Sequence, residues 1–387
     1  MSKKKTVKAM NELLRIDLRK EYRHSLFGRW EGKDLSATII SATTDASYAC
    51  DDSFILSFVG ETVIQSCNGG HNWDYYRGPR HWPKANMIME AGKNLIAINS
   101  GREFCRSYDG GITWGKKFII PSAKDVHFDR LSGALCFSGI LTRRGRIVLA
   151  NSYWTGQEGP DGELLSTTTS DDWGQTWEVS RLFGPAAPLP YGPEGFGEPA
   201  IVEMKSGWLW MVFRTLYGEL WQAISQDGGL SWGPPTPTGF TSPIANCYAA
   251  RHPDSGATVL AWNMTIPGTD VNFRSKDSLY RPRTNLVFSI SHDNCRTWSC
   301  PVTVEKDQGL YPRIFFSGNA MFIIYQSSHE KVRGWSDYGL TLVGYDKTEV
   351  DLLFPWTVET IQPYIDAGLV ANWRAVGLQS KPKETVD

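Results

Sequence analysis

The sequence lacks both a secretory signal and a membrane-spanning segment. Residues 3–5 are basic, but no apolar stretch follows them, and no run elsewhere reaches the roughly 18 to 20 apolar residues that a membrane-spanning helix needs. These absences exclude the usual sequence marks of secretion and membrane insertion. The sequence therefore predicts a cytoplasmic protein that does not have a membrane as its partner.

The chain also has no excess of charge of either sign. It carries 40 Lys and Arg residues against 41 Asp and Glu residues, a net charge of −1, so no overall field draws it to nucleic acid. No phosphate-binding loop and no basic stripe interleaved with aromatic residues is present. The sequence therefore predicts no nucleic-acid partner, and a charged ligand would need a local site.

Cysteine is scarce and irregularly placed. The seven cysteines are odd in number and none has Cys-x-x-Cys spacing, which indicates neither a disulfide framework nor a cysteine-based zinc site. Free thiols in a reducing compartment are the simpler interpretation. Because no other metal-ligand constellation is present either, the sequence predicts no metal and no other cofactor.

One eight-residue phrase occurs five times. Its pattern is Ser-x-Asp/Asn-x-Gly-x-Thr/Ser/Asn-Trp, with Cys295 in place of the Gly in the last copy. The phrase suits a hairpin turn, because Asp or Asn can accept a hydrogen bond from the backbone two residues on and Gly can adopt a positive φ. The Trp is expected to pack beneath the turn. A recurring motif of this kind indicates a repeat architecture. The five copies are residues 66–73, 107–114, 170–177, 225–232 and 291–298.

This phrase resembles the Asp-box, and the chain resembles the sialidase (neuraminidase) superfamily of β-propellers. In that family the boxes are structural and lie away from the catalytic pocket. The 37 glycines, 16 tryptophans and 12% aromatic content are typical of many short strands joined by tight turns. The resemblance implies an all-β propeller with a carbohydrate site on the side opposite the boxes.

The repeat also predicts the strands. Aligning Ser66 with Ser107 superimposes two units without a gap from Asp45 onward, each reading strand A, strand B, a tight Gly turn, strand C, box and strand D, which is one propeller blade. Later strands are predicted at 134–141, 146–153, 163–169, 199–204, 208–215, 220–225, 246–252, 257–263, 283–291, 311–316, 320–326 and 339–346.

The last of these units has no fourth strand, and residues 35–42 are predicted to supply it and close the ring. The expected fold is therefore a six-bladed propeller of four-stranded antiparallel blades, with seven blades as the alternative. All 387 residues are assigned to one domain, since all-β folds often run long as a single unit. A short helix is expected at 7–20, blades at 35–348 and a C-terminal cap at 349–387.

Strand alternation assigns residues to the two ends of the propeller. The A–B turns and the boxes share one end, whereas the B–C loops and the connections between blades share the other. Long insertions occur only at B–C positions, at 154–162, 264–282 and 327–338, which predicts binding loops there. Strand-end residues expected at that end are Asp45, Arg80, His81, Arg102, His127, Asp129, Tyr153, Trp154, Glu198, Arg214, Asn246, Asn263, Arg283, Tyr311 and Arg313.

Four of these residues gain a role from the resemblance. Sialidases present in chain order a Glu, an Arg, a second Arg and a Tyr, and Glu198, Arg214, Arg283 and Tyr311 fall in that order. Two guanidinium groups can hold a carboxylate in a planar, bidentate geometry. A Tyr hydroxyl, with a pKa near 10, needs a neighbouring carboxylate to take its proton as it attacks an anomeric carbon.

The first blade departs from the family pattern. Thr44-Asp45-Ala46 stands where sialidases open with Arg-Ile-Pro, and the turn at Gly60 is too tight for the catalytic Asp of the family. Candidate replacements are Arg80 or Arg102 for the third positive charge and Asp45, His127 or Asp129 for proton transfer. Further substrate contacts are expected from Tyr153, Trp154, Asn246 and Asn263.

Three functions stay open on these residues. The first is an exo-glycosidase of sialidase type that acts on a terminal acidic sugar. The second is another reaction on an acidic glycan, such as β-elimination from a uronate, with His127 or Tyr311 as the base. The third is a non-catalytic propeller that binds glycan or protein, which the missing acid favours.

Overall fold

The structure is a computed structural model, and it describes the chain in segments. For residues 20–27, 37–41, 55–59, 62–66 and 74–75 it describes the course of the strands alone. The other described residues are 83, 85, 87–92, 94–99, 102–111, 113–121, 132–154, 163–183, 195–265, 283–317, 319–328 and 339–353.

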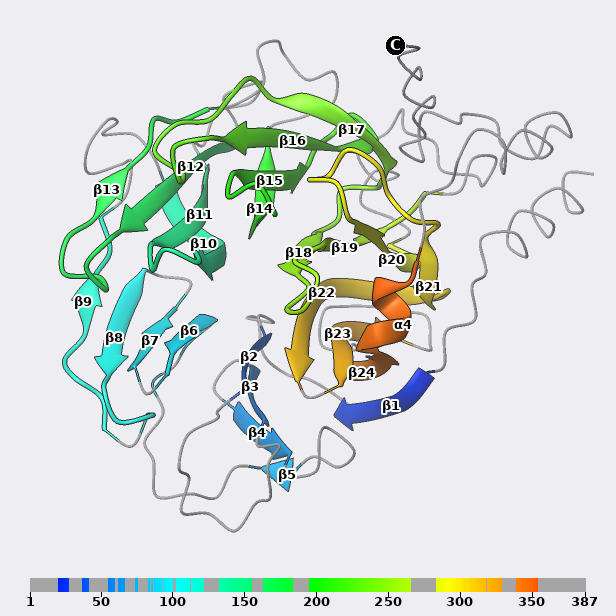
Figure 1. Cartoon of the computed structure of the whole chain (residues 1–387), viewed down its shortest axis with the longest axis horizontal. Coiled ribbons are helices and arrows are strands. Elements are labelled where there is room, and N and C mark those ends of the chain that lie inside the picture. Colours follow the sequence, from blue (N-terminus) through cyan, green and yellow to red (C-terminus); the bar gives the residue numbers. More distant parts are fainter. Residues whose placement is uncertain are drawn as a thin grey trace, which may run out of the picture.

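Within the described residues, the strands form six four-stranded antiparallel sheets around a common centre (Figure 1). We number these sheets blade 1 to blade 6 in chain order. The strands of blades 1 to 3 are β2 (Ala37–Ser41), β3 (Ile55–Val59), β4 (Thr62–Ser66) and β5 (Asp74–Tyr75); β6 (Met87–Ala91), β7 (Asn94–Ile98), β8 (Glu103–Ser107) and β9 (Phe118–Ile119); and β10 (Ser132–Leu141), β11 (Ile147–Trp154), β12 (Glu163–Ser170) and β13 (Glu178–Val179).

Blades 4 to 6 follow the same order, except that blade 6 takes its outer strand from the start of the chain. Their strands are β14 (Gly197–Glu203), β15 (Leu209–Arg214), β16 (Glu219–Ser225) and β17 (Thr236–Thr241); β18 (Tyr248–Arg251), β19 (Thr258–Asn263), β20 (Leu286–Ser291) and β21 (Val302–Glu305); and β22 (Gln308–Ser317), β23 (Ala320–Ser328), β24 (Gly339–Asp346) and β1 (Lys20–Phe27).

The inner strands close the ring. Each of β2, β6, β10, β14, β18 and β22 contacts the next, and β22 contacts β2. An all-β propeller, as the sequence predicts, is therefore confirmed, and the predicted strands of blades 3 to 6 lie within a few residues of those observed.

The closing strand was predicted wrongly. Residues 37–41 form β2, the inner strand of blade 1, and β1 pairs with β24 instead. Both β1 and β24 are eight residues long, so β1 covers the whole edge of β24, which the five residues of β2 would leave half open. The predicted helix at 7–20 falls outside the described residues except for Lys20, which begins β1.

Each box of blades 2 to 5 contains the same internal pattern of hydrogen bonds. In blade 3 the Ser170 hydroxyl donates to Asp172 Oδ1 (2.9 Å) and accepts from the backbone N–H of Gly174 (2.8 Å), while Thr176 donates through its N–H (2.8 Å) and hydroxyl (2.6 Å) to Asp172. The Asp thus bonds the residue four positions on, rather than two as predicted. The predicted positive φ of the Gly is confirmed, at 80° for Gly174.

Four of the described hydrophobic clusters lie between two adjacent blades, and in three of them the box Trp of the later blade contributes. Trp298 of blade 5 packs against Trp210 of blade 4, with ring centroids 5.5 Å apart. Trp232 of blade 4 donates from Nε1 to the Thr167 hydroxyl of blade 3 (2.9 Å). The box Trp therefore contacts the preceding blade as well as its own turn.

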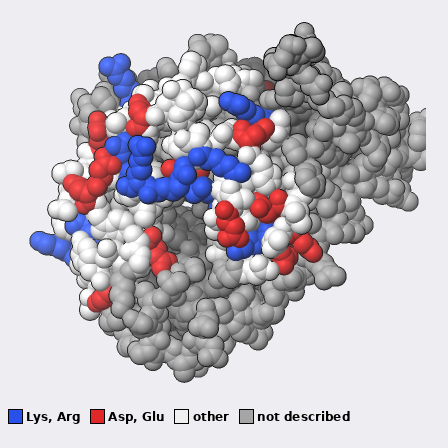
Figure 2. Space-filling view, viewed as in Figure 1, with Lys and Arg blue, Asp and Glu red and all other residues white. Residues whose placement is uncertain are grey.

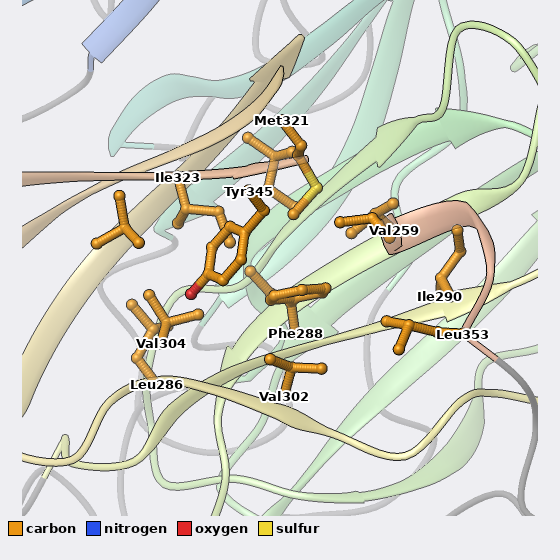
Figure 3. Close-up of a cluster of buried hydrophobic side chains, with 14 of the residues drawn as sticks. Val259, Leu286, Phe288, Ile290, Val302, Val304, Met321, Ile323, Tyr345 and Leu353 are labelled. Carbon is orange, nitrogen blue, oxygen red and sulfur yellow. The ribbon is translucent and has the colours of Figure 1, made fainter. Parts of the chain in front are cut away.

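The cluster between blades 5 and 6 shows how side chains of two adjacent blades pack together (Figure 3). Tyr345 of β24 lies in the middle of the cluster, and its ring meets Phe288 of β20 edge-on at 5.0 Å. The helix α4 (Lys347–Asp351) follows β24 and lies against blade 6, and Leu353 beyond it enters the same core. The beginning of the predicted C-terminal cap therefore packs on the propeller, and residues beyond 353 lie outside the described ones.

Candidate active site

Glu198 and Arg214 form the centre of the site, at the end of blade 4 opposite the boxes. Gly197 at the start of β14 pairs with Arg214 at the end of β15, which places Arg214 beside Glu198. Arg214 Nη1 lies 3.1 Å from Glu198 Oε2, and both side chains are about nine-tenths buried. An ion pair with this little exposure is shielded from water and holds both groups in place.

Arg283 and Tyr311 join this pair from blades 5 and 6. Arg283 lies over the Tyr311 ring, with its Cζ 5.7 Å from the ring centroid, and its guanidinium donates to the Tyr311 hydroxyl. Burial raises the pKa of Tyr311, and the negative charge of Glu198 raises it further against the opposing effect of Arg283 and Arg214. Tyr311 is therefore a neutral phenol within the electrostatic influence of the Glu198 carboxylate.

The backbone is left-handed at both Glu198 and Tyr311. Their φ angles are 46° and 51°, and each residue lies at a register irregularity at the start of an inner strand, followed by a proline. Non-glycine residues in this region cost of order 1–3 kcal/mol each, and they cluster at functional sites. The irregularity turns the two side chains out of the strand alternation, as bulges beside active sites do.

Glu163, at the start of β12 in blade 3, is a site residue that the sequence reasoning missed. Its Oε2 lies 3.7 Å from Arg214 Nη2, and its Oε1 accepts from the Ser152 hydroxyl (2.5 Å). A Cβ on Gly197 would collide with the Glu163 carboxylate, so a larger residue there would displace that carboxylate. Arg214 therefore lies between two carboxylates. The strand-end rule would have identified Glu163, because it begins a C strand.

Arg313 supplies a third guanidinium that was not assigned a role. It is buried at 8% exposure, donates to Asn246 Oδ1 (3.1 Å) and lies over the Tyr248 ring at 4.9 Å. Burial lowers its pKa, and the electrostatic influence of Tyr248, Glu198 and Tyr311 opposes that change. Arg313 thus adds a buried positive charge within the electrostatic influence of Glu198 and Tyr311. Sequence order alone could not distinguish it from a solvated rim residue.

The predicted substrate contacts divide into buried and accessible residues. Asn263 is fully buried and donates to the carbonyls of Arg283, Thr284 and Gly309, which fixes the chain around Arg283. Asn246 is held by Arg313, as described above. Both asparagines support the site from within.

Tyr153 and Trp154 have opposite surroundings. Tyr153 is fully buried against Val179 and Leu182, and its hydroxyl accepts from Ser166 (2.9 Å), so it is a core residue rather than the substrate contact predicted. Trp154 is 51% exposed and pairs across the ladder with Glu163. Trp154 therefore borders the site, and its contact with a substrate stays a prediction.

The remaining predicted residues do not join this centre in the described structure. Arg102 donates from Nη1 to the Ile120 carbonyl (2.8 Å) beside the outer strand of blade 2. The predicted start of an inner strand at Asp45 is wrong, because β2 ends at Ser41. Asp45, Arg80, His127 and Asp129 lie outside the described residues.

Among the described residues, the centre carries more positive than negative charge. Its positive charges are those of Arg214, Arg283 and Arg313, and its negative charges are those of Glu198 and Glu163. An anionic ligand would therefore balance the charge of the site. In the described part of the chain, no group of three or more His, Cys, Asp or Glu side chains is placed to hold a metal ion. Among the described helices, none has the length and apolar character that a bilayer crossing requires.

Family comparison identifies the repeat. The model of the BNR repeat-like domain matches residues 87–324, more than half of the chain, and the protein belongs to this family. The fold is that of a sialidase-like BNR β-propeller. No curated protein sequence matches the chain.

Solved structures share the fold at low sequence identity. A mutant of Trypanosoma rangeli sialidase that displays trans-sialidase activity is 14% identical over 90% of this chain and 61% of its own, with a TM-score of 0.52. T. rangeli sialidase in complex with 2,3-difluoro-KDN is 16% identical over 86% and 59%, also at 0.52.

A Dyadobacter fermentans protein of unknown function is 14% identical over 85% of this chain and 99% of its own, with a TM-score of 0.53. The present chain thus spans about 60% of the trypanosomal sialidases but nearly all of the bacterial protein. At these identities the likeness defines the fold.

Proposed function

We propose that this protein is a glycosidase of sialidase type that removes a terminal acidic sugar, with Tyr311 as nucleophile and Glu198 as its base. The observation that carries the proposal is the matched backbone of these two residues. Both have a left-handed φ at the start of an inner strand, and Arg214 and Arg283 lie beside them. Strain of this kind persists where the surrounding structure over-determines it, and function is the usual reason.

An acidic sugar suits the charges of the centre. In this proposal Arg283 and Arg214 bind the carboxylate of the sugar, and Arg313 adds further positive charge. A neutral Tyr nucleophile also avoids the repulsion that a carboxylate would meet from such a substrate.

The proposed reaction has two steps. In the first, Tyr311 Oη bonds to the anomeric carbon, the bond from that carbon to the leaving oxygen breaks, the phenol proton passes to Glu198, and a general acid protonates the leaving oxygen. In the second, water replaces Tyr311 on the anomeric carbon and gives one proton to the former acid, while Glu198 returns its proton to the phenolate. Two displacements retain the anomeric configuration.

Glu163 orients Arg214 in this scheme and does not touch the reacting atoms. We propose Asp45, His127 and Asp129 as candidates for the general acid, and Arg80 as a further contact for the substrate. Trp154 is proposed to contact the sugar on the leaving side, because it is exposed next to Glu163.

The test is turnover by the Tyr311→Phe variant on a panel of aryl glycosides of sialic and uronic acids. We expect wild-type release of the aryl group and a loss on the order of 10³-fold or more in the variant, at unchanged melting temperature. A 2,3-difluorinated sialic acid would add its mass to the tryptic peptide that contains Tyr311. Equal turnover by the variant would exclude Tyr311 as the nucleophile.

The same panel separates the other functions. An unsaturated product that absorbs in the ultraviolet would indicate β-elimination in place of hydrolysis. Binding of acidic sugars without any turnover by the wild type would indicate a glycan-binding propeller.

A further inference from the structure

A polar groove separate from the candidate active site lies at the box end of blades 3 and 4. It has a cavity volume of about 710 Å³ and is formed by the β10–β11 turn, the β14–β15 turn and the box turns of the same two blades. Figure 2 shows Lys and Arg side chains gathered in a band beside the central hollow of the ring. Four of the residues that line the groove are basic, namely Arg143, Arg144, Arg146 and Lys205.

The two strand turns that form the groove have the same geometry. Gly145 and Gly207 occupy equivalent positions, with φ angles of 84° and 86°, and each donates its N–H to the residue three positions earlier. Arg143 and Lys205 are therefore equivalent residues in neighbouring turns. The groove repeats one structural element on its two sides, so its shape follows from the spacing of the blades.

Two ion pairs make the walls rigid. Arg146 binds Asp171 through Nε and Nη2, both at 2.6 Å, and donates from Nη1 to the carbonyls of Asp227 and Gly228 in the next blade. Arg143 donates from Nε to the buried Glu203 at 3.2 Å, and its Nη2 reaches the carbonyl of Lys205 at 3.2 Å. These bonds tie blade 3 to blade 4 before any ligand is present.

Several donors in the groove are left for a ligand. Arg144 and Lys205 have no charged partner among the described residues, and Arg143 Nη1 donates to none of them. Trp208 lines the same groove and is 42% exposed. Three cationic donors next to an accessible indole match a ligand that has both an anionic group and an apolar face.

We infer that this groove binds an acidic oligosaccharide, with a carboxylate or sulfate on Arg144 and Lys205 and a sugar ring stacked on Trp208. Three acidic residues, Asp171, Glu203 and Asp227, also line the groove. They would repel the closely spaced phosphates of a nucleic acid, whereas the exposed Asp171 carboxylate can accept from sugar hydroxyls. The mixture of charges therefore favours a glycan over a polyphosphate.

The groove is separate from the candidate active site. Leu209 at one end of β15 lines the groove, and Arg214 at the other end belongs to the site. Five residue steps along a strand span about 17 Å. A chain held in the groove would keep the protein on its glycan without entering the centre around Tyr311, and the inference does not depend on the proposed reaction.

The test uses the full chain carrying Tyr311→Phe, so that turnover does not disturb the measurement. Calorimetric titration with a galacturonic acid hexamer, a sulfated heparin hexasaccharide and neutral maltohexaose would compare carboxylate, sulfate and uncharged ligands. We expect binding of at least one acidic hexamer, and weakening by about tenfold or more when Arg144 and Lys205 are both changed to Ala. Trp208→Ala should also weaken binding. It should abolish the change in tryptophan fluorescence that the acidic hexamer causes when its sugar ring stacks on Trp208.

Lys116→Ala is the matched control, because Lys116 is an exposed cation of blade 2 outside the groove. It should leave the affinity unchanged. Unchanged affinity in the Arg144→Ala, Lys205→Ala variant would overturn the proposal, as would an absence of binding to either acidic hexamer. Equal or tighter binding of a single-stranded DNA hexamer at the same Arg and Lys residues would assign the groove to nucleic acid instead.

Discussion

At the box end of blade 3, Asp172 is bonded by Ser170 and Thr176 of its own eight-residue turn, whereas at the opposite end Glu163 and Glu198 reach an arginine from different blades. The box Asp needs only neighbours in sequence, so each box forms independently and can be repeated. The pairing of Glu163 with Arg214 depends on the packing of blade 3 against blade 4. A single substitution at the box end should therefore disturb one turn, whereas a substitution at the site end should disturb contacts between blades.

The backbone shows the same difference. The box turns contain two consecutive residues with positive φ, as hairpin turns require, and glycine fills most of these positions, as at Gly228 and Gly229. At the site end the left-handed positions hold Glu198 and Tyr311. Glycine adopts this conformation without steric cost, but Glu and Tyr do not. In the described box turns glycine thus avoids the strain at five of the eight left-handed positions, and Trp173, Asn294 and Cys295 take the other three.

The largest effect is expected when the carboxylate is removed from the site end. Glu198→Gln keeps the shape of the side chain and removes the base for Tyr311, so kcat should fall on the order of 10³-fold, equivalent to ~4 kcal/mol of barrier. Steady-state kinetics on the aryl glycoside that the wild type accepts would measure it. The melting temperature is the control, and a fall in stability with unchanged kcat would make Glu198 a structural residue like the box Asp.

A substitution at the box end should have the opposite signature. Trp298 is 4% exposed and packs on Trp210, so Trp298→Ala should lower the free energy of unfolding by ~3 kcal/mol. Chemical denaturation would measure it. Turnover per folded molecule should stay as in the wild type, and a large loss in kcat would show that the two ends are coupled.

A glycine substitution tests whether Glu163 orients Arg214. In Gly197→Ala the new Cβ would displace the Glu163 carboxylate, and Glu163→Gln would weaken its pairing with Arg214 directly. Both variants should raise KM about tenfold, ~1.4 kcal/mol, while kcat changes little, because substrate positioning is lost rather than the base.

Gly233→Ala in the same blade is the control, since its Cβ would meet only the Ile224 carbonyl at 3.4 Å, an ordinary contact. It should leave KM unchanged. A loss of kcat equal to that of Glu198→Gln would instead give Glu163 a direct part in the reaction.

The fold could be predicted because its signals are local. The eight residues of a box determine its turn without help from distant residues. Four of the five boxes have side chains in the described structure, and all four form turns: residues 107–114, 170–177, 225–232 and 291–298. The closing strand was assigned wrongly because pairing with β24 depends on strand length and on contacts across almost the whole chain. No local pattern distinguishes such a strand from an inner one.

The site could be predicted only where strand register decides it. Register and family order led to Glu198, Arg214, Arg283 and Tyr311, which the structure brings together. Glu163 begins a predicted C strand, so the strand-end rule could have found it. Its pairing with Arg214 could not be predicted, because Arg214 is 51 positions away in sequence and in another blade. Tyr153 was placed on the site side by its position near the strand end, yet it faces the core. Strand alternation distinguishes these faces only when the partner blade is known.

The smallest effect should come from protonation of a box Asp. Hydrogen bonds from the Thr176 hydroxyl and N–H lower the pKa of Asp172 from 3.8 to about 2, even though the side chain is exposed. A group whose pKa is lower in the folded state stabilises the fold above its unfolded value and loses that contribution as the pH falls through the folded value. Thermal melting of the wild type should therefore show a falling melting temperature between about pH 4 and pH 2. Asp172→Asn should melt slightly lower than the wild type at neutral pH and show a shallower fall on acidification. Parallel curves for the two proteins would mean that the acid response comes from the buried carboxylates at the other end of the blades.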